Sequence, residues 1–423
     1  MTSKIIVNNI ESDVGISSVT FNDTISGNLE GNINSSGTST FNVISGVSTI
    51  GVTTIHVNGI NDISYPTIGP LSHRNMCING AMQVAQRGTS STGQTTGGYK
   101  TVDRFDNGIS NVGTWTISQS TDAPAGFSNS LKYECTTASA SLNAAAQLYY
   151  VQKIEAQNLQ QLAYGSSDAK QCTFSFYFKT NKTGVYTVEI FQNASSKSIS
   201  FPMGVSQTGW QRYEFVVPGD TAGTINNDSG VGLWCFLWLA GGSNYTSGTF
   251  NNGTWATNVH ANRLSSSQVN FADSTSNECF FTGVQLETGS VATPFEHRSF
   301  GDELARCRRY YQTSFTSSPG TGNTDNTGIV LAGGSTTGNT TTFLGPAHVQ
   351  LAPSMRAAPT VTIYDLATPR ATGNVHRHTY GSAGSNGNVA VVTDINQHSF
   401  IVRSDSGISA SGIIFHYEVE AEL

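Results

Sequence analysis

Apolar and polar residues alternate through the middle of the chain in runs of seven to nine residues. Turn sequences such as Asn181–Gly184 separate these runs. Side chains of a strand point alternately to its two faces, so these runs predict β-strands. The predicted strands are Thr173–Lys179, Val185–Gln192, Gln211–Val217, Val231–Leu239 and Glu278–Leu286. Their spacing is typical of a β-sandwich or jelly roll over residues 71–300, in which Asn143–Ala163 forms either a short helix or a strand plus loop.

The last part of the chain, residues 301–423, also reads as β-rich. Its predicted strands are Phe343–Leu351, Thr360–Tyr364, Val389–Thr393, Ser399–Arg403 and Gly412–Glu420. In the last of these, Ile414, His416, Glu418 and Glu420 alternate with Ile413, Phe415, Tyr417 and Val419. One polar and one apolar face predict a half-buried strand.

A short helix is predicted at Asp302–Tyr311, between these two regions. Gly301 and Asp302 offer a cap, and arginines gather toward its end, where the helix dipole favours positive charge. One apolar stripe runs along this helix: Phe300, Leu304, Cys307 and Tyr311. A stripe of this kind needs a covering surface, so we expect these four residues to form an oligomer contact.

Residues 1–70 form a distinct segment with a weak internal repeat. Thr20-Phe21-Asn22 followed by Ile25-Ser26-Gly27 recurs as Thr40-Phe41-Asn42 followed by Ile44-Ser45-Gly46. Units this small cannot fold alone and must stack on neighbours or on other chains. We expect intertwined β-strands from three identical chains; a disordered linker is the alternative.

Composition supports an all-β protein: an N-terminal intertwined β segment, a central sandwich or jelly roll, a short connecting helix and a C-terminal β domain. Only 12% of the 423 residues are charged and 44 are glycines, a mix that disfavours helices. The net charge of −7 and the lack of a basic stripe argue against a nucleic-acid partner. No apolar run reaches membrane-spanning length and no signal peptide is evident, so we expect a soluble protein made in a cytoplasm, with its six cysteines buried and reduced.

Several stretches resemble bacteriophage tail-fibre and related virion proteins, especially those of marine and cyanobacterial phages. The stretches that carry the resemblance are residues 1–12, Arg74–Arg87 (RNMCINGAMQVAQR), Val102–Phe105 (VDRF), Phe281–Tyr311 and Met355–Thr362. The resemblance implies a virion component with a carbohydrate-binding-module-like jelly roll, in a family whose fibres are commonly trimers. It implies no catalytic residues.

Aromatic residues supply the candidate binding site. Trp234, Phe236 and Trp238 share one face of a predicted strand whose other face is also apolar. Because aromatic faces stack on the C–H face of sugars, that face could hold a glycan, although sandwich packing or a subunit contact is the favoured interpretation. Tyr245 and Trp255, in a predicted loop, are the better glycan candidates. Trp210 is expected to pack structurally.

Other chemistry finds little support in the sequence. His376, His378, His398 and His416 could approach one another, yet solvent-facing or interface roles are preferred, so we expect neither metal nor cofactor. Six acids are scattered without a motif that marks a catalytic pair: Asp103, Glu134, Glu189, Glu214, Glu287 and Glu296. Asp103 and Arg104 are expected to form a structural ion pair, and residues 296–298 to anchor the helix.

These observations favour a non-enzymatic virion protein. The first hypothesis is a tail-fibre-like homotrimer that attaches to other virion proteins by its N-terminus and presents host-glycan-binding domains, with loops Ser317–Asn339 and Thr372–Asn388 facing outward. The alternatives are a head, neck or tail decoration or adaptor protein without a receptor role, and a glycan-degrading fibre.

Overall fold

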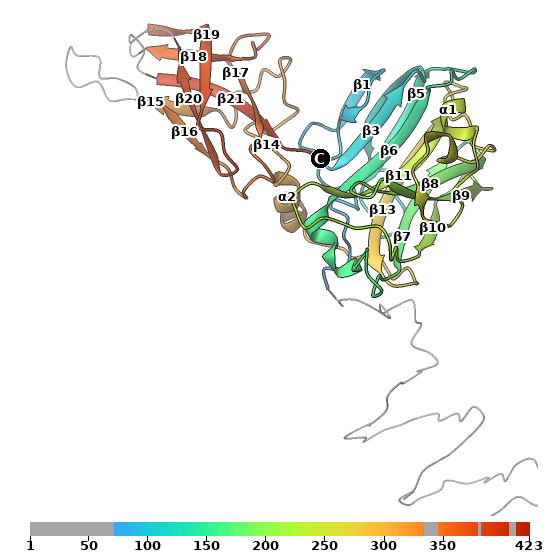
Figure 1. Cartoon of the computed structure of the whole chain (residues 1–423). Helices are drawn as coiled ribbons and strands as arrows, with labels where there is room; N and C mark the ends of the chain where they lie inside the picture. Colours follow the sequence, from blue (N-terminus) through green and yellow to red (C-terminus); the bar gives the residue numbers. More distant parts are fainter. Residues whose placement is uncertain (1–71, 334–345, 380–381, 406–411) are drawn as a thin grey trace, which may run out of the picture. The chain divides into compact units, whose positions relative to one another are not determined.

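The computed structural model describes residues 72–333, 346–379, 382–405 and 412–423 (Figure 1). All of them belong to one compact unit, Gly59–Leu423. The predicted trimeric segment 1–70 lies outside the described residues, as do parts of the two loops expected to face outward. None of the described helices is long and apolar enough to cross a membrane.

Two antiparallel sheets lie between Ser90 and Thr288. The first has six strands in the order β1 (Ser90–Gln94), β4 (Thr114–Ser120), β5 (Ser130–Thr137), β13 (Glu278–Thr288), β7 (Cys172–Thr180) and β10 (Gln211–Val217). The second has seven, in the order β12 (Ala256–Thr257), β9 (Lys197–Val205), β8 (Gly184–Gln192), β11 (Val231–Gly241), β6 (Gln147–Glu155), β3 (Phe105–Ser110) and β2 (Gly98–Tyr99).

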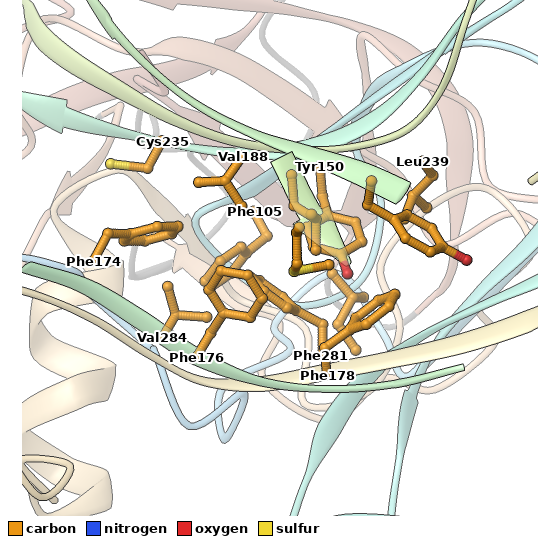
Figure 2. Packing of buried hydrophobic residues seen from close by; sticks show 14 of the residues in the cluster. Phe105, Tyr150, Phe174, Phe176, Phe178, Val188, Cys235, Leu239, Phe281 and Val284 are labelled. Carbon is orange, nitrogen blue, oxygen red and sulfur yellow. The ribbon is translucent and has the colours of Figure 1, made fainter. Parts of the chain in front are cut away.

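The inner faces of these sheets share one hydrophobic core, which makes the pair a β-sandwich of the jelly-roll kind. Phe174, Phe176 and Phe178 of β7 are each at most 1% exposed. In Figure 2 they face Val188 of β8 and Tyr150 of β6 across the core. Burying an aromatic side chain of this kind contributes about 1.5–3 kcal/mol, so this alternation along β7 holds the sheets together.

The five strands predicted for this region are confirmed with shifts of at most two residues at their ends. Asn143–Ala163 contains β6 followed by the 3-10 helix η2 (Ala156–Leu162). All six cysteines are free and buried, as expected. Apart from β6, the remaining strands of the two sheets were not predicted from the pattern, and most of them are rich in Ser, Thr or Gly.

Helix α2 (Phe300–Arg308) follows the sandwich, and a single-turn helix α1 (Ser243–Thr246) and the 3-10 helix η3 (His260–Asn262) lie in the loop after β11. Helix α2 begins two residues earlier than predicted, because Ser299 is its cap and accepts a hydrogen bond from the Asp302 amide at 3.2 Å. Arg298 donates to Glu303 of this helix and to Glu296, each at 3.0 Å, which confirms the expected anchor.

The apolar stripe on α2 is covered largely by the chain itself. Cys307 and Tyr311 are 0% and 1% exposed, so their burial needs no second subunit. Leu304 is half-buried, and Phe300 is 57% exposed. An oligomer contact at this stripe therefore stays a prediction that rests on Phe300 and Leu304.

The C-terminal region forms a third antiparallel sheet with its own core. The order of its strands is β14 (Tyr311–Thr313), β21 (Gly412–Glu420), β18 (Asn374–Thr379), β19 (Ser382–Thr393), β20 (Ser399–Ser404) and β16 (Ala347–Gln350). Two further strands, β15 (Val330–Gly333) and β17 (Thr360–Tyr364), also pair with β21. Phe400, Phe415 and Val419 are fully buried in that core. The strand predicted at Phe343–Leu351 is seen as β16, and its first residues lie outside the described ones.

Buried charges tie α2 and the last residues to the sandwich. Arg104, 1% exposed, donates to the Glu422 carboxylate and to the Lys153 carbonyl oxygen, and its guanidinium lies 3.4 Å from the centre of the Tyr310 ring. Glu155 accepts hydrogen bonds from Arg309 at 2.7 and 2.9 Å and from the Tyr310 hydroxyl at 2.6 Å.

The expected ion pair between Asp103 and Arg104 is wrong. Asp103 instead accepts from Gln86 and lies 3.9 Å from the Arg87 guanidinium, whereas Arg104 pairs with Glu422. Both residues lie in the turn before β3, where Arg104 has a φ of +73°, so their side chains reach different partners.

Replacing Arg104 by Met tests this junction. The change leaves Glu422 buried without its cation and should lower the free energy of unfolding by about 3–5 kcal/mol. Urea denaturation of the full chain measures it. Arg306→Met is the matched control, since the Arg306–Asp302 pair is partly exposed and its loss should cost less than about 1 kcal/mol. Equal losses in the two variants would contradict the role of Arg104.

Candidate functional site

The outer face of the seven-stranded sheet carries a row of large aromatic residues. In β11, Leu233, Cys235, Leu237 and Leu239 point into the core, while Trp234, Phe236 and Trp238 point outward. Tyr149 and Val151 of β6 lie opposite Trp238 and Phe236 in register, and Phe191 of β8 lies opposite Trp234. Both faces of β11 are thus apolar, as the sequence predicts.

These outward rings form one continuous stack. The ring centres of Trp234 and Phe236 are 5.6 Å apart at 18°, and those of Phe236 and Trp238 are 5.9 Å apart at 25°. Tyr245 of α1 continues the stack at 5.4 Å from Trp238, and His260 follows at 5.9 Å from Tyr245. At these separations the rings overlap as an offset stack, so each inner ring is contacted from both sides.

A buried ion pair fixes the middle of the stack. The Arg263 guanidinium lies 4.8 Å from the Trp238 ring centre and 5.1 Å from that of Phe236. Glu189, 0% exposed, accepts from Arg263 at 2.8 Å and from the Trp238 indole N–H at 2.8 Å. Burial is the largest single effect and would lower the pKa of Arg263, but the charge and hydrogen bond of Glu189, together with Tyr149 and Tyr245, raise this pKa overall. The guanidinium therefore stays charged and holds the loop over Trp238.

Tyr149 completes the covered part of the stack, and a glycine makes room for it. Its ring centre is 4.7 Å from that of Trp238 and 5.1 Å from that of Phe236. Any Cβ at Gly108 of β3 would overlap the Tyr149 ring. Burial raises the pKa of Tyr149 to about 12, so its hydroxyl stays neutral.

The stack is open at Trp234, which is half-buried. Phe191 meets Trp234 edge-on at 6.1 Å and 82°, and the Lys153 ammonium lies 4.5 Å from the Trp234 ring centre. Lys153 also pairs with Asp106 at 2.9 Å and donates to the Leu423 backbone oxygen at 2.7 Å. The Trp234 indole nitrogen is buried and has no hydrogen-bond partner among the described residues. An aromatic ring, a cation and a carboxylate thus meet at this end.

The structure separates the four glycan candidates. Trp234, Trp238 and Tyr245 belong to the same stack, but Trp238 is 0% and Tyr245 7% exposed, so only Trp234 is open to a ligand in this conformation. Trp255 lies elsewhere: its indole N–H donates to the Pro218 carbonyl at 2.7 Å and its ring packs against the main core. Trp210 has the structural role expected of it, donating to Asp122 at 3.0 Å beside Phe280.

Sequence reasoning missed Tyr149, Phe191, Lys153 and Arg263 as members of this site. Alternation along Gln147–Glu155 puts Tyr149, Val151 and Lys153 on one face and was available as a signal. The register that brings this face beside Trp234 could not be read from the sequence, because it depends on pairing between strands that are about 80 residues apart in the chain.

Four of the six scattered acids are held by separate partners in the described structure: Asp103 by Gln86, Glu134 by Lys132, Glu189 by Arg263 and Glu214 by Arg212. Glu287 and Glu296 lie near each other, since both contact Arg74 and Gln285. Glu287 is 0% exposed and accepts from Thr293, and Glu296 pairs with Arg298, so both are engaged in structural contacts.

The four histidines also have separate surroundings. His376 lies 2.8 Å from the Asn386 amide oxygen, His398 lies 2.9 Å from the Ser354 hydroxyl, and His378 is exposed. His416 is 0% exposed and stacks on Phe315 at 4.1 Å and 11°. Within the described ranges, no group of three or more His, Cys, Asp or Glu side chains is arranged to hold a metal ion.

Comparisons with known proteins add three similar structures. No family model matches the chain, and no curated protein matches it. The chain is similar to a family 16 carbohydrate-binding module (11% identity, 40% of this chain and 84% of that one, TM-score 0.21). It is also similar to a CBM4 structure (14% identity, 41% of this chain and 86% of that one, TM-score 0.22). A third similar structure is TmCBM61 in complex with β-1,4-galactotriose (8% identity, 51% of this chain and 99% of that one, TM-score 0.25). Likeness at this level does not assign a function.

His416 should make stability depend on pH. Burial, with Arg370 nearby, lowers the pKa of His416 from 6.5 to about 4. Since the unfolded chain takes up this proton first, the stabilising contribution of neutral His416 is complete above about pH 6.5 and is lost as the pH falls through about 4.

The measurement is thermal unfolding of the full chain between pH 7 and pH 4, compared with His416→Phe, which keeps a ring against Phe315 and removes the titrating group. The variant should lose less stability than the original chain over this range. Identical pH profiles would contradict the assignment.

Proposed function

We propose that the chain is a non-catalytic sugar-binding protein whose site is the open end of the aromatic stack at Trp234. The observation that carries the proposal is the meeting of a half-buried indole ring with the Lys153–Asp106 pair on an outer sheet face. Small-molecule sites combine apolar, aromatic walls with a few polar groups that fix orientation. A sugar ring offers both matching surfaces, a C–H face for the indole and hydroxyls for the polar groups.

The chemistry of binding follows from the contacts. The sugar packs against the Trp234 and Phe191 rings, while its hydroxyls bond to the Lys153 ammonium and the Asp106 carboxylate. The buried Arg263–Glu189 pair keeps the rings behind Trp234 in place, so little ordering is needed on binding. Two rings and two polar groups make a weak site, of the order of a millimolar dissociation constant.

The setting we propose is a bacteriophage virion, in a trimeric tail-fibre-like protein made in the host cytoplasm. Support comes from the resemblance of Arg74–Arg87 and Val102–Phe105 to fibre proteins. Those stretches supply Arg87 and Arg104, which hold the C-terminal region to the sandwich, so the shared motif has a structural use. Three weak sites in one particle component would bind more strongly together through their high effective concentration.

Trp234→Ala should abolish most sugar binding. It removes the half-buried indole ring against which we propose that the sugar packs, and we expect a loss of tenfold or more in affinity for a panel of gluco-, galacto- and manno-oligosaccharides, measured by isothermal titration calorimetry on the full chain. Trp210→Ala is the matched control, because Trp210 is also half-buried but lies on the other sheet. Binding that survives in Trp234→Ala, or falls equally in both variants, would refute the site.

The trimer is tested by multi-angle light scattering. The purified chain should have three times its mass of 44.9 kDa. Leu304→Asp should weaken the assembly by placing a charge on the half-buried stripe, whereas Ala305→Asp, an exposed neighbour on the same helix, should not. A stable monomer of the original chain would rule out the trimeric fibre.

A further inference from the structure

We propose that the Trp234 site selects uncharged sugars over acidic ones, an inference that rests on the proposed sugar-binding function. Each of the two cations that contact the aromatic stack is already matched by a carboxylate on the same face. Lys153 lies 2.9 Å from Asp106, and Arg263 lies 2.8 Å from Glu189. Neither cation that contacts the stack is therefore free to pair with a uronate or a sulfate.

The geometry of the Lys153–Asp106 pair makes it costly to open. Its side chains are 11% and 18% exposed, so little water is available to replace the lost partner. Lys153 also donates to the Leu423 backbone oxygen and lies 5.7 Å from the Tyr99 ring centre. An anionic sugar would have to approach Asp106 or separate it from Lys153, and either step opposes binding.

Other charged groups nearby do not change this balance. Lys100 is half-buried and faces the same Asp106 carboxylate, which draws its charge as well; burial lowers its pKa. His260 is exposed at the far end of the stack, beyond Trp238 and Tyr245. At the open end, an acidic ligand would meet the Asp106 carboxylate. The Lys153 ammonium beside it is already paired with that carboxylate and is not free to pair with the ligand.

A neutral sugar, in contrast, finds an unused hydrogen-bond donor. An ammonium carries three N–H groups, and Lys153 engages two, with Asp106 and the Leu423 oxygen. The third is left for a hydroxyl, whereas the Trp234 indole nitrogen is buried and offers no such donor. The third N–H serves a hydroxyl without disturbing either ion pair.

Matched oligosaccharides test the selectivity on the full chain by calorimetry. Each pair differs only at C6, where a CH₂OH group of a gluco-, galacto- or manno-oligosaccharide is replaced by a carboxylate. The neutral member should bind at least tenfold more tightly, with little change between 50 and 500 mM NaCl, because no ligand charge is screened. Tighter binding of the uronates would overturn the inference and leave the proposed function standing. Binding of neither class would contradict both.

A charge variant gives an independent readout. Asp106→Asn leaves Lys153 without its carboxylate and should raise the affinity for the uronates several-fold. Asp122→Asn is the matched control: Asp122 pairs with Lys179 at 2.6 Å, and Lys179 lies 5.1 Å from the Phe280 ring centre, but on the other sheet. No gain in Asp106→Asn, or an equal gain in the control, would contradict the role of Asp106 in excluding acidic sugars.

Discussion

The buried guanidinium of Arg104 is the constraint on which the rest of the described structure depends. A permanently charged group that is 1% exposed must be matched by a carboxylate, and its partner, Glu422, lies 318 residues later in the chain. Tyr310 covers the same guanidinium, and Glu155 holds Tyr310 and Arg309 in turn. Helix α2 and the last residues are thereby held against the seven-stranded sheet, at the edge where Lys153 and Asp106 lie.

The same rule of matched charge shapes the outer face of that sheet. Glu189 is buried there because Arg263 and the Trp238 indole N–H satisfy its oxygens. This pair closes the stack at Trp238 and leaves Trp234 as its accessible end. The candidate site therefore lies where the half-buried rings of Trp234 and Phe191 meet, beside the Lys153–Asp106 pair.

The sequence pattern predicts the fold class and the strands with continuous apolar runs, because one face of each such strand must enter a core. It fails for strands such as Ser90–Gln94 and Thr114–Ser120, whose Ser and Thr residues read equally well as loops. It shows that both faces of Val231–Leu239 are apolar and favours sandwich packing or a subunit contact for Trp234, so it predicts neither that Trp234 faces away from the core nor which ring stays open. That depends on the loop that places Tyr245 and Arg263 over Trp238, and on pairing between residues far apart in the chain.

The most direct test of the account is fluorine NMR of the full chain labelled with 5-fluorotryptophan, which gives one signal for each of its five tryptophans. During titration with a neutral oligosaccharide, the Trp234 signal should shift and saturate. The signal of Trp115, which is 0% exposed in the core, should stay unchanged. A largest shift at Trp210 or Trp255, or no shift at Trp234 under conditions where the sugar binds, would contradict the placement of the site.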